Sequence, residues 1–482
     1  MNERNALKDQ CERYAYGAIG GREDALAVKT SYEKEFQQIG RNAMPLIATF
    51  LLQFSLSSVT ILFVGRLGAV ELGGVSLANV TFTATSAVFV GMATCLDTLC
   101  PQAYGAGQYK LVGLYFQRGL AINAVFSIPI ALLWWFSKSI LCKIVDDMRL
   151  VEIAARYLRI MVACIPGYIT FECGKKYLQA QNDFTTAQNI LFACAPLNVL
   201  FNYLFVFKFG WGIVGAPIAT TTTYTLMGVS IIFAVLRLNW TKREIHCWSS
   251  LKDWREIFKS WDSMIYLAVP GIIMIEAEFL AFETLTVLSA KFGTELLAAQ
   301  SVAASIQSLT FQVPFSVSVA ASNRIAYHIG TGNSHNCKVA TRTTLLQFGS
   351  LIGVVNFLIL VLGRNRICSF FTRDTAVQQA AAQILPIIGI NQLYDAFNVL
   401  AAGCLRAQGR QRVGGYLNIV AYYAIGLPLA LIMGFHYKLG LQGFWIGLGV
   451  GILILALGEL YCIQKSNWAG IIHSSHLLHQ EV

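Results

Sequence analysis

The sequence has 482 residues, of which 55% are hydrophobic and only 13% are charged. This charged fraction is too small to cover a soluble protein of such length, so lipid is the expected solvent for most of the chain. The net charge of +10 does not indicate nucleic-acid binding, because the basic residues are not gathered in one soluble patch.

The first 41 residues are polar and are expected to form a cytoplasmic tail, 1–41. They contain no apolar core of the kind found in signal peptides, so no cleaved signal is expected.

Twelve mostly apolar windows follow this tail. A membrane core of about 30 Å needs about 20 such residues per helical crossing. We therefore expect an all-α polytopic membrane protein with about twelve transmembrane helices. The expected crossings are 43–65, 74–97, 117–139, 152–173, 186–208, 212–236, 263–289, 295–321, 342–363, 379–404, 414–436 and 441–463.

The positive charges predict the orientation. With both termini cytoplasmic, most of the 36 lysines and arginines fall on the inner side, many of them in the N-terminal tail and in the loop 237–262. Within that loop, the stretch from Trp248 to Trp261 aligns Leu251, Trp254 and Phe258 on one helical face, which predicts an interfacial amphipathic segment. The residues 464–482 are expected to form a cytoplasmic C-terminal tail.

Short sequence matches recur at offsets of about 223 to 228 residues, which indicates an internal duplication. Six crossings return the chain to the same side of the membrane, so the two copies are expected to be parallel repeats with a cleft between them. The N-lobe would comprise 42–236 and the C-lobe 263–463. The matched pairs are Leu178–Gln181 with Leu405–Gln408, Gly212–Gly215 with Gly440–Gly443, Ala103–Tyr104 with Ala326–Tyr327, and Pro45 with Pro270.

Several longer motifs stand in order along the apolar part of the chain. They are LDTLCPQAYGA at 96–106, VPG at 269–271 with Glu278 and Glu283 after it, FQVPFSVSVAASNR at 311–324, QLYD at 392–395, GCLRAQG at 403–409 and YYAIGLP at 422–428. Together they resemble the eukaryotic branch of the MATE family of multidrug and toxin extrusion transporters over residues 40 to 463, and within that branch they are most similar to fungal members.

This resemblance implies a V-shaped antiporter with two lobes. In such a protein, protons, or in some relatives sodium ions, move inward as organic solutes move out. The sequence departs from the family pattern at Ala277, Phe279 and Ala407, which bears on the substrate range more than on the class.

Acidic residues within the predicted crossings are the sharpest functional signal, because one acid at a helix centre costs at least about 2.5 kcal/mol. The seventh crossing holds Glu276, Glu278 and Glu283, and the tenth holds Asp395. The resemblance implies that Glu278, Glu283 and Asp395 take part in proton coupling. We take Glu278 and Asp395 as the central pair. Burial or a neighbouring carboxylate brings the pKa of a carboxyl group toward neutral pH, as such coupling requires.

Helix geometry separates the three acids of the seventh crossing. At 100° per residue, Glu276 and Glu283 share a face, whereas Glu278 lies about 140 to 160° from both. A distortion after Pro270 or a division of labour is therefore needed, and Glu276 is expected to be structural.

Other polar groups are expected to line the cavity. Asn391 and Gln392 share the helical face of Asp395, and Tyr422 and Tyr423 precede a bend that we expect at Pro428.

The N-terminal half offers fewer candidates. Gln53, Asn198 and Asn202 are polar groups inside its crossings, and the two asparagines are more typical of contacts between helices than of a cargo site. Asp97 ends the second crossing and is expected to have a structural or gating role. A second ion site in this half is not supported by the sequence, so proton chemistry is expected in the C-terminal half.

Three other functions stay open as alternatives. They are a sodium-coupled exporter of the same family, a flippase for lipid-linked substrates, which would need a cationic cavity, and a membrane-embedded enzyme, which would need clustered catalytic groups. The favoured hypothesis is a monomeric exporter of organic cations in exchange for protons. It would use no cofactor or metal and would lie in the plasma or vacuolar membrane.

Overall fold

The structure, a computed structural model, describes residues 29–241, 247–248 and 254–480. In these ranges the chain is helical and contains no strand. Eleven helices among the described residues are long and apolar enough to cross a membrane. These results confirm the predicted all-α membrane fold.

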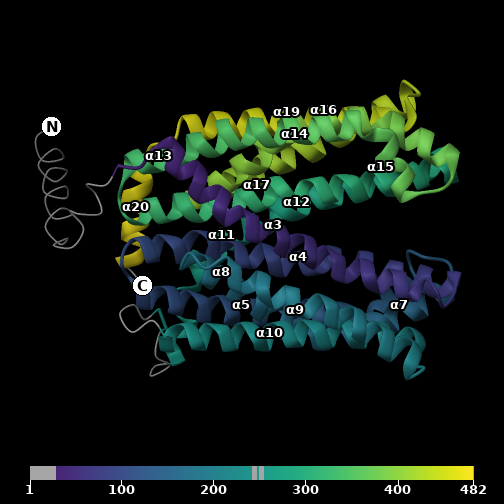
Figure 1. Cartoon of the computed structure of the whole chain (residues 1–482), viewed down its shortest axis with the longest axis horizontal. Coiled ribbons are helices and arrows are strands. Elements are labelled where there is room, and N and C mark those ends of the chain that lie inside the picture. The colour runs from purple at the N-terminus through teal and green to yellow at the C-terminus, as the bar shows by residue number, and fades with distance from the viewer. Residues whose placement is uncertain (1–28, 242–246, 249–253, 481–482) are drawn as a thin grey trace, which may run out of the picture.

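The predicted fourth crossing, 152–173, is divided. It consists of α7 (Met148–Met161), the 3₁₀-helix η1 (Val162–Cys164) and α8 (Ile165–Ala180). Pro166 stands at the start of α8 and has no backbone N–H, which favours the break. Because α7 lies at one end of the molecule and α8 toward the other (Figure 1), we take the broken segment as the remaining expected crossing.

The first half of the chain begins with α3 (Tyr32–Val64), whose N-cap is Ser31. The remaining elements of this half alternate between the two ends of the molecule. They are α4 (Ala69–Gly105), α5 (Tyr109–Trp135), α6 (Ser137–Leu141), the broken segment just described, α9 (Thr185–Asn202), the π-helix η2 (Tyr203–Lys208), η3 (Gly212–Val214) and α10 (Gly215–Thr241).

Within the expected amphipathic segment, the structure describes a short 3₁₀-helix, η4 (Trp254–Phe258), and the residues 249–253 lie outside the described residues. The second half then repeats the alternation. Its elements are α11 (Trp261–Ser289), η5 (Ala290–Phe292), α12 (Thr294–Gly330), α13 (Ser334–Arg342), η6 (Thr343–Phe348), α14 (Gly349–Leu362), α15 (Arg364–Phe371), α16 (Thr375–Ala407), α17 (Gln411–Ile419), η7 (Val420–Gly426), α18 (Leu427–Leu431), η8 (Ile432–His436), α19 (Gly440–Gln464) and α20 (Trp468–Gln480).

The first helix of each half packs against the second helix of the other half. Helix α3 lies against α12, and α11 lies against α4. In Figure 1, α3 runs obliquely between the group that holds α12 to α19 and the group that holds α4 to α10. The two groups are thus joined by exchanged helices as well as by the chain between them.

The two halves meet closely at the end of the molecule that holds the start of α3 and the helix α20, which we call the termini end (Figure 1). Thr98 Oγ1 of α4 donates a hydrogen bond of 2.6 Å to the backbone carbonyl of Arg406. Gln102 Nε2 donates to the carbonyl of Ala407 at 2.8 Å, and Gln411 Nε2 donates to Thr98 Oγ1 at 2.8 Å. These neutral contacts close the termini end.

Two glycines allow the backbones to approach at this point. A Cβ added at Gly105 would lie 2.2 Å from the carbonyl oxygen of Tyr327, and one added at Gly330 would lie 2.1 Å from that of Gln102. Both distances are far below van der Waals contact, so α4 and α12 can cross here only with glycine at each position.

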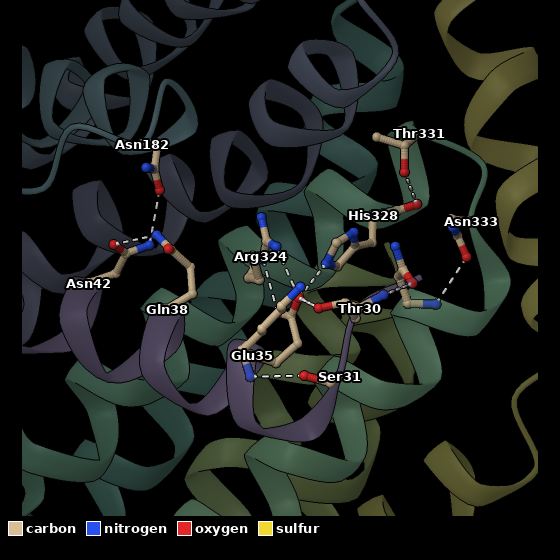
Figure 2. Close-up of polar contacts among 12 residues, drawn as sticks. Thr30, Ser31, Glu35, Gln38, Asn42, Asn182, Arg324, His328, Thr331 and Asn333 are labelled. Carbon is tan, nitrogen blue, oxygen red and sulfur yellow. Dashed lines mark hydrogen bonds and ion pairs between the residues drawn. The ribbon is translucent and has the colours of Figure 1, made fainter. Parts of the chain in front are cut away.

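An ionic cluster fixes the start of α3 to α12 (Figure 2). Glu35 is fully buried and accepts hydrogen bonds from Arg324 Nε and a terminal guanidinium nitrogen, both at 2.9 Å. His328 Nε2 lies 3.1 Å from the same carboxylate, and Thr30 Oγ1 donates to it at 2.8 Å. The start of α3 is therefore held to the second half, although it belongs to the first half in sequence.

Helix α20 spans both halves at the termini end. Ser475 Oγ donates to Gln102 Oε1 at 2.7 Å, and a hydrogen bond of 3.0 Å joins His479 Nδ1 to the hydroxyl of Tyr115. Burial, assisted by the neighbouring His476, lowers the pKa of His479 to about 4, so this imidazole is neutral at physiological pH.

The crossing of α4 and α12 predicts the effect of one added methyl group. Gly330→Ala should cost about 1 to 3 kcal/mol and loosen the termini end, because the new Cβ overlaps the Gln102 carbonyl. A cysteine placed at Thr98 should then react faster with maleimide. Gly40→Ala is the control, since its Cβ would meet only an ordinary contact at 3.6 Å. Equal labelling in the two backgrounds would contradict this account.

The cluster in Figure 2 predicts a second effect. Glu35→Gln leaves Arg324 and His328 without their carboxylate and should lower the free energy of unfolding by about 1 to 3 kcal/mol. The loss should stay below that of a fully buried pair because Arg324 is 28% exposed. Denaturation of the purified protein in detergent measures it. The exposed Glu33→Gln is the matched control, and equal stability of the two variants would rule out the cluster as an anchor.

Candidate functional site

A cavity of about 370 Å³ lies between the two halves. Phenylalanines and polar side chains dominate its wall. They are Phe54, Phe279, Phe282, Phe311, Phe315, Glu278, Glu283, Gln307, Gln312, Asn398 and Arg406, among others. A second cavity, of about 850 Å³, lies at the termini end and is lined in part by Thr98. The hydrogen bond from Thr98 to the Arg406 carbonyl therefore stands between the two cavities.

Both predicted acids of α11 line the first cavity. The residues that α11 contributes, from Met274 to Thr286, follow a helical stripe, and at 100° per residue Glu278 and Glu283 lie on opposite sides of Phe279 and Phe282. Glu276 does not line this cavity, and one of its carboxylate oxygens is buried without a hydrogen bond in the described structure. The wide aromatic stripe thus accommodates two acids that simple helix geometry separates.

Asp395 is fully buried and is held by side-chain amides. Gln307 Nε2 donates to its Oδ2 at 3.3 Å, Gln392 Nε2 donates to the same oxygen at 3.2 Å, and Asn398 Nδ2 donates to Oδ1 at 3.3 Å. No lysine or arginine forms an ion pair with Asp395, Glu278 or Glu283 in the part of the chain that the structure describes. These acids are therefore free to change protonation without breaking an ion pair.

The amide orientation around Asp395 is set by one further residue. Asn356 Nδ2 donates to Gln392 Oε1 at 2.8 Å, so Gln392 must turn its NH₂ group toward Asp395 and Gln307. Asp395 consequently faces N–H donors and not oxygen ligands.

Tyr422 connects the acids of α11 and α16. It is fully buried, and its side chain lies close enough to Glu278 and Asp395 for electrostatic interaction. It belongs to the π-helix η7, a wide turn that precedes Pro428 and relieves the clash of that proline with the preceding carbonyl groups. Pro270, in contrast, is buried within α11, which runs through it as one α-helix.

Two residues expected in the cavity point elsewhere. Asn391 Nδ2 donates to the backbone carbonyl of Trp445 at 3.0 Å, and its side chain contacts α19 and not Asp395. Tyr423 is 39% exposed and does not line the cavity. Asn391 is four residues from Asp395 on the same helical face, but this spacing did not direct its side chain toward Asp395, because a carbonyl of α19 lies closer.

Buried acids are not confined to the second half. Glu172 is buried in α8 and binds Lys175 Nζ at 2.9 Å, while Gln53 Nε2 donates to the same carboxylate at 2.9 Å. Asp97 is buried as well and pairs with Lys176 Nζ at 2.7 Å. The structure therefore shows two buried ion pairs in the first half, and neither Gln53 nor Asp97 lines the cavity.

Asn198 and Asn202 join helices of the first half. Asn198 Nδ2 donates to Thr223 Oγ1 of α10 at 3.1 Å, and Asn202 Nδ2 donates to the Asn198 carbonyl at 2.9 Å. Neither residue lines the cavity, in keeping with a role in helix packing.

Sequence reasoning missed four groups around the cavity. Gln307 and Asn398 hold Asp395, Arg406 lines the cavity wall, and Glu459 is fully buried in α19 near Arg406. Glu459 falls within the predicted crossing 441–463, so the search for acids inside crossings would have found it. Among the described residues, no cluster of histidine, cysteine or acidic side chains could hold a metal ion.

Comparisons with known proteins identify the family. The chain matches the MatE family over residues 45–204 and 270–432. It is 39% identical to an uncharacterized transporter of Saccharomyces cerevisiae, over 93% of this chain and 64% of that protein's length. It is 30% identical to multidrug and toxin extrusion protein 2 of Mus musculus, over 94% of this chain and 78% of that protein.

Solved structures agree with this relationship. The eukaryotic MATE transporter AtDTX14 superposes with a TM-score of 0.86 at 27% identity, covering 92% of this chain and 98% of that one. The Vibrio cholerae MATE transporter VcmN in its bent form, at 20% identity and a TM-score of 0.80 over 93% and 100% of the two chains, shares the fold. With its series of apolar helices and its cavity between two halves, this chain belongs to the MatE family of multi-pass membrane transporters and is not an enzyme.

Proposed function

We propose that this protein exports amphipathic organic cations in exchange for protons by alternating access of its two halves. The observation that carries this proposal is the contrast between the acids. Glu172 and Asp97 are each neutralised by a lysine, whereas Glu278 and Glu283 line a cavity, and Asp395 is buried against the amide of the lining residue Gln307. None of these three acids has an ion-pair partner in the part of the chain that the structure describes. Such acids hold either a proton or a cationic solute, and competition between the two couples their movements.

The cavity wall favours organic cations as the substrate class. Five phenylalanines line it, and an aromatic face attracts a cation, most strongly where water is excluded. Glu278 and Glu283 supply negative charge at the two edges of the aromatic stripe on α11. A mainly apolar wall with a few placed charges is typical of small-molecule sites.

Proton coupling is favoured over sodium coupling by the surroundings of Asp395. A sodium ion would need several oxygen ligands, but both carboxylate oxygens of Asp395 accept hydrogen bonds from amide N–H groups. The bond from Asn356 to Gln392 opposes the amide rotation that would present an oxygen instead. A proton needs no such ligand shell.

Alternating access follows from the placement of the contacts between the halves. The lining stretches of α11 and α12 lie beyond the Thr98–Arg406 contact, so the cavity is separated from the termini end. Because most lysines and arginines belong to the tails and loops at that end, we place it in the cytoplasm. The arrangement then corresponds to a transporter closed toward the cytoplasm, and export requires the same contact to open.

The first test separates proton from sodium coupling. In proteoliposomes that contain the purified protein, an imposed pH gradient should drive ethidium across the membrane, and dissipating the gradient should abolish this net movement. A sodium gradient alone should drive none. Transport that survives loss of the pH gradient and requires sodium would overturn proton coupling.

The second test addresses the two central acids. Glu278→Gln and Asp395→Asn each remove the titratable group with little change in shape, so pH-driven ethidium transport should fall by at least about tenfold. Glu152→Gln is the control, because Glu152 is an exposed acid paired with Lys138. Wild-type transport rates in both acid variants would contradict the proposed site.

A further inference from the structure

Glu459 is a buried acid of the second half to which the proposed antiport assigns no role. Its side chain is fully buried in α19, and neither carboxylate oxygen has a hydrogen-bond partner in the described structure. Buried carboxylates are normally paired or hydrogen-bonded, so an isolated one calls for an explanation.

The neighbours of Glu459 come from several helices. Helix α19 packs against α16, α17, η7, α18 and η8. Arg406 and Cys404 of α16, Tyr422 of η7 and Glu278 of α11 lie within range of its charge.

The other packed elements add no titratable group at this level. Helix α18 carries none in its sequence, and His436 of η8 adjoins the opposite end of α19. In α17, Arg412 lies over the ring of Tyr266 and Tyr416 is exposed.

Arg406 does not neutralise Glu459 by a closed ion pair. No contact within 4 Å joins them, and Arg406 donates instead to Ser318 Oγ at 3.0 Å and lies over the ring of Phe315. Its Nε is buried without a hydrogen bond in the described residues. A carboxyl group in this setting is stable when it holds a proton, and a nearby guanidinium supports the charged form when the proton leaves.

The height of Glu459 in the membrane is informative. Glu459 lies five residues, or about 8 Å, before the last residue of α19, which is at the termini end. Asp395 lies about 18 Å before the last residue of α16, which is at the same end. Just past Glu459, the cavity of about 850 Å³ is lined by Gln408, Arg410 and Lys465. Glu459 thus lies between the acids of the first cavity and the second cavity.

Tyr422 lies between the acids of the first cavity and Glu459. Its hydroxyl is buried without a hydrogen bond in the described structure, and Glu278, Asp395 and Glu459 all lie within range of it. A phenol can accept a proton at its oxygen while giving its own to a neighbouring carboxylate, so that it ends unchanged.

We propose that Glu459 is the proton acceptor that receives the coupling proton from Glu278 or Asp395, through the hydroxyl of Tyr422, and releases it to the cavity at the termini end. In this step, the carboxyl O–H bond of Glu278 or Asp395 breaks and the Tyr422 oxygen takes the proton. Because neither the Tyr422 hydroxyl nor Glu459 has a hydrogen-bond partner in the described state, the two side chains must first rotate into contact. The Tyr422 hydroxyl then gives its proton to the Glu459 carboxylate, which becomes neutral, and solvent at the second cavity accepts that proton. The inference rests on the proposed proton antiport, and it adds an exit path on α19.

The test separates net transport from substrate exchange. Ethidium counterflow, measured in proteoliposomes without a pH gradient, requires substrate binding and opening of both sides but no net proton movement. Glu459→Gln mimics the protonated side chain, so counterflow should stay within about twofold of wild type, while pH-driven ethidium transport should fall by at least about tenfold. Tyr422→Phe should lower the pH-driven transport as well, and Glu459→Asp should restore part of the driven transport.

Each other outcome decides against the relay. Wild-type rates in both assays would show that Glu459 carries no proton. Loss of both activities in a monodisperse Glu459→Gln protein would assign the residue to packing or to the substrate site. Glu278→Gln should lose both activities, because that acid also faces the substrate, and Glu152→Gln should keep both. Absence of pH-driven transport in the wild type would refute the antiport itself.

Discussion

An ionised carboxylate inside a membrane protein must have a partner, because the surrounding medium solvates charge poorly. The two halves meet this constraint in different ways. The first half pairs Glu172 with Lys175 and Asp97 with Lys176, so these four buried charges cancel locally. The second half surrounds Asp395 with amides and leaves Glu459 without a partner in the described structure, so neither acid is neutralised by a lysine or arginine there. One scaffold, used twice, therefore has one ionically fixed half and one half suited to titration.

Much of the scaffold could be predicted from the sequence, because membrane helices follow hydropathy and length. The broken fourth crossing was the least regular case. Glu152, Arg156, Arg159 and Glu172 interrupt its apolar window, and the division at Pro166 is a backbone feature without a hydropathy signal. The duplication was visible because repeated motifs serve a physical purpose. The segments that end in Tyr104 and Tyr327 are those that meet at the termini end.

The candidate site was predicted in part. Glu278, Glu283 and Asp395 were found because acids stand out against apolar sequence. Gln307 could not be found in this way, since an amide in a helix shows its role only when its partner is known, and the turn of Asn391 toward α19 depended on the position of a distant carbonyl. The lysines that neutralise the acids of the first half directly follow a predicted crossing. Basic residues are common at such positions, so these lysines did not stand out in the sequence.

The kinds of bond at the interface explain how such a molecule can move. The ion pairs of the first half join α8 to itself and to α4, and the Glu35–Arg324 pair joins α3 to α12. The contacts of Thr98, Gln102 and Gln411 across the termini end are neutral hydrogen bonds. A neutral bond contributes about 1 kcal/mol net, because water replaces it on opening, whereas separating a buried charge pair costs several times more. Opening at the termini end can therefore exchange bonds with water while the ion pairs within the first half stay closed.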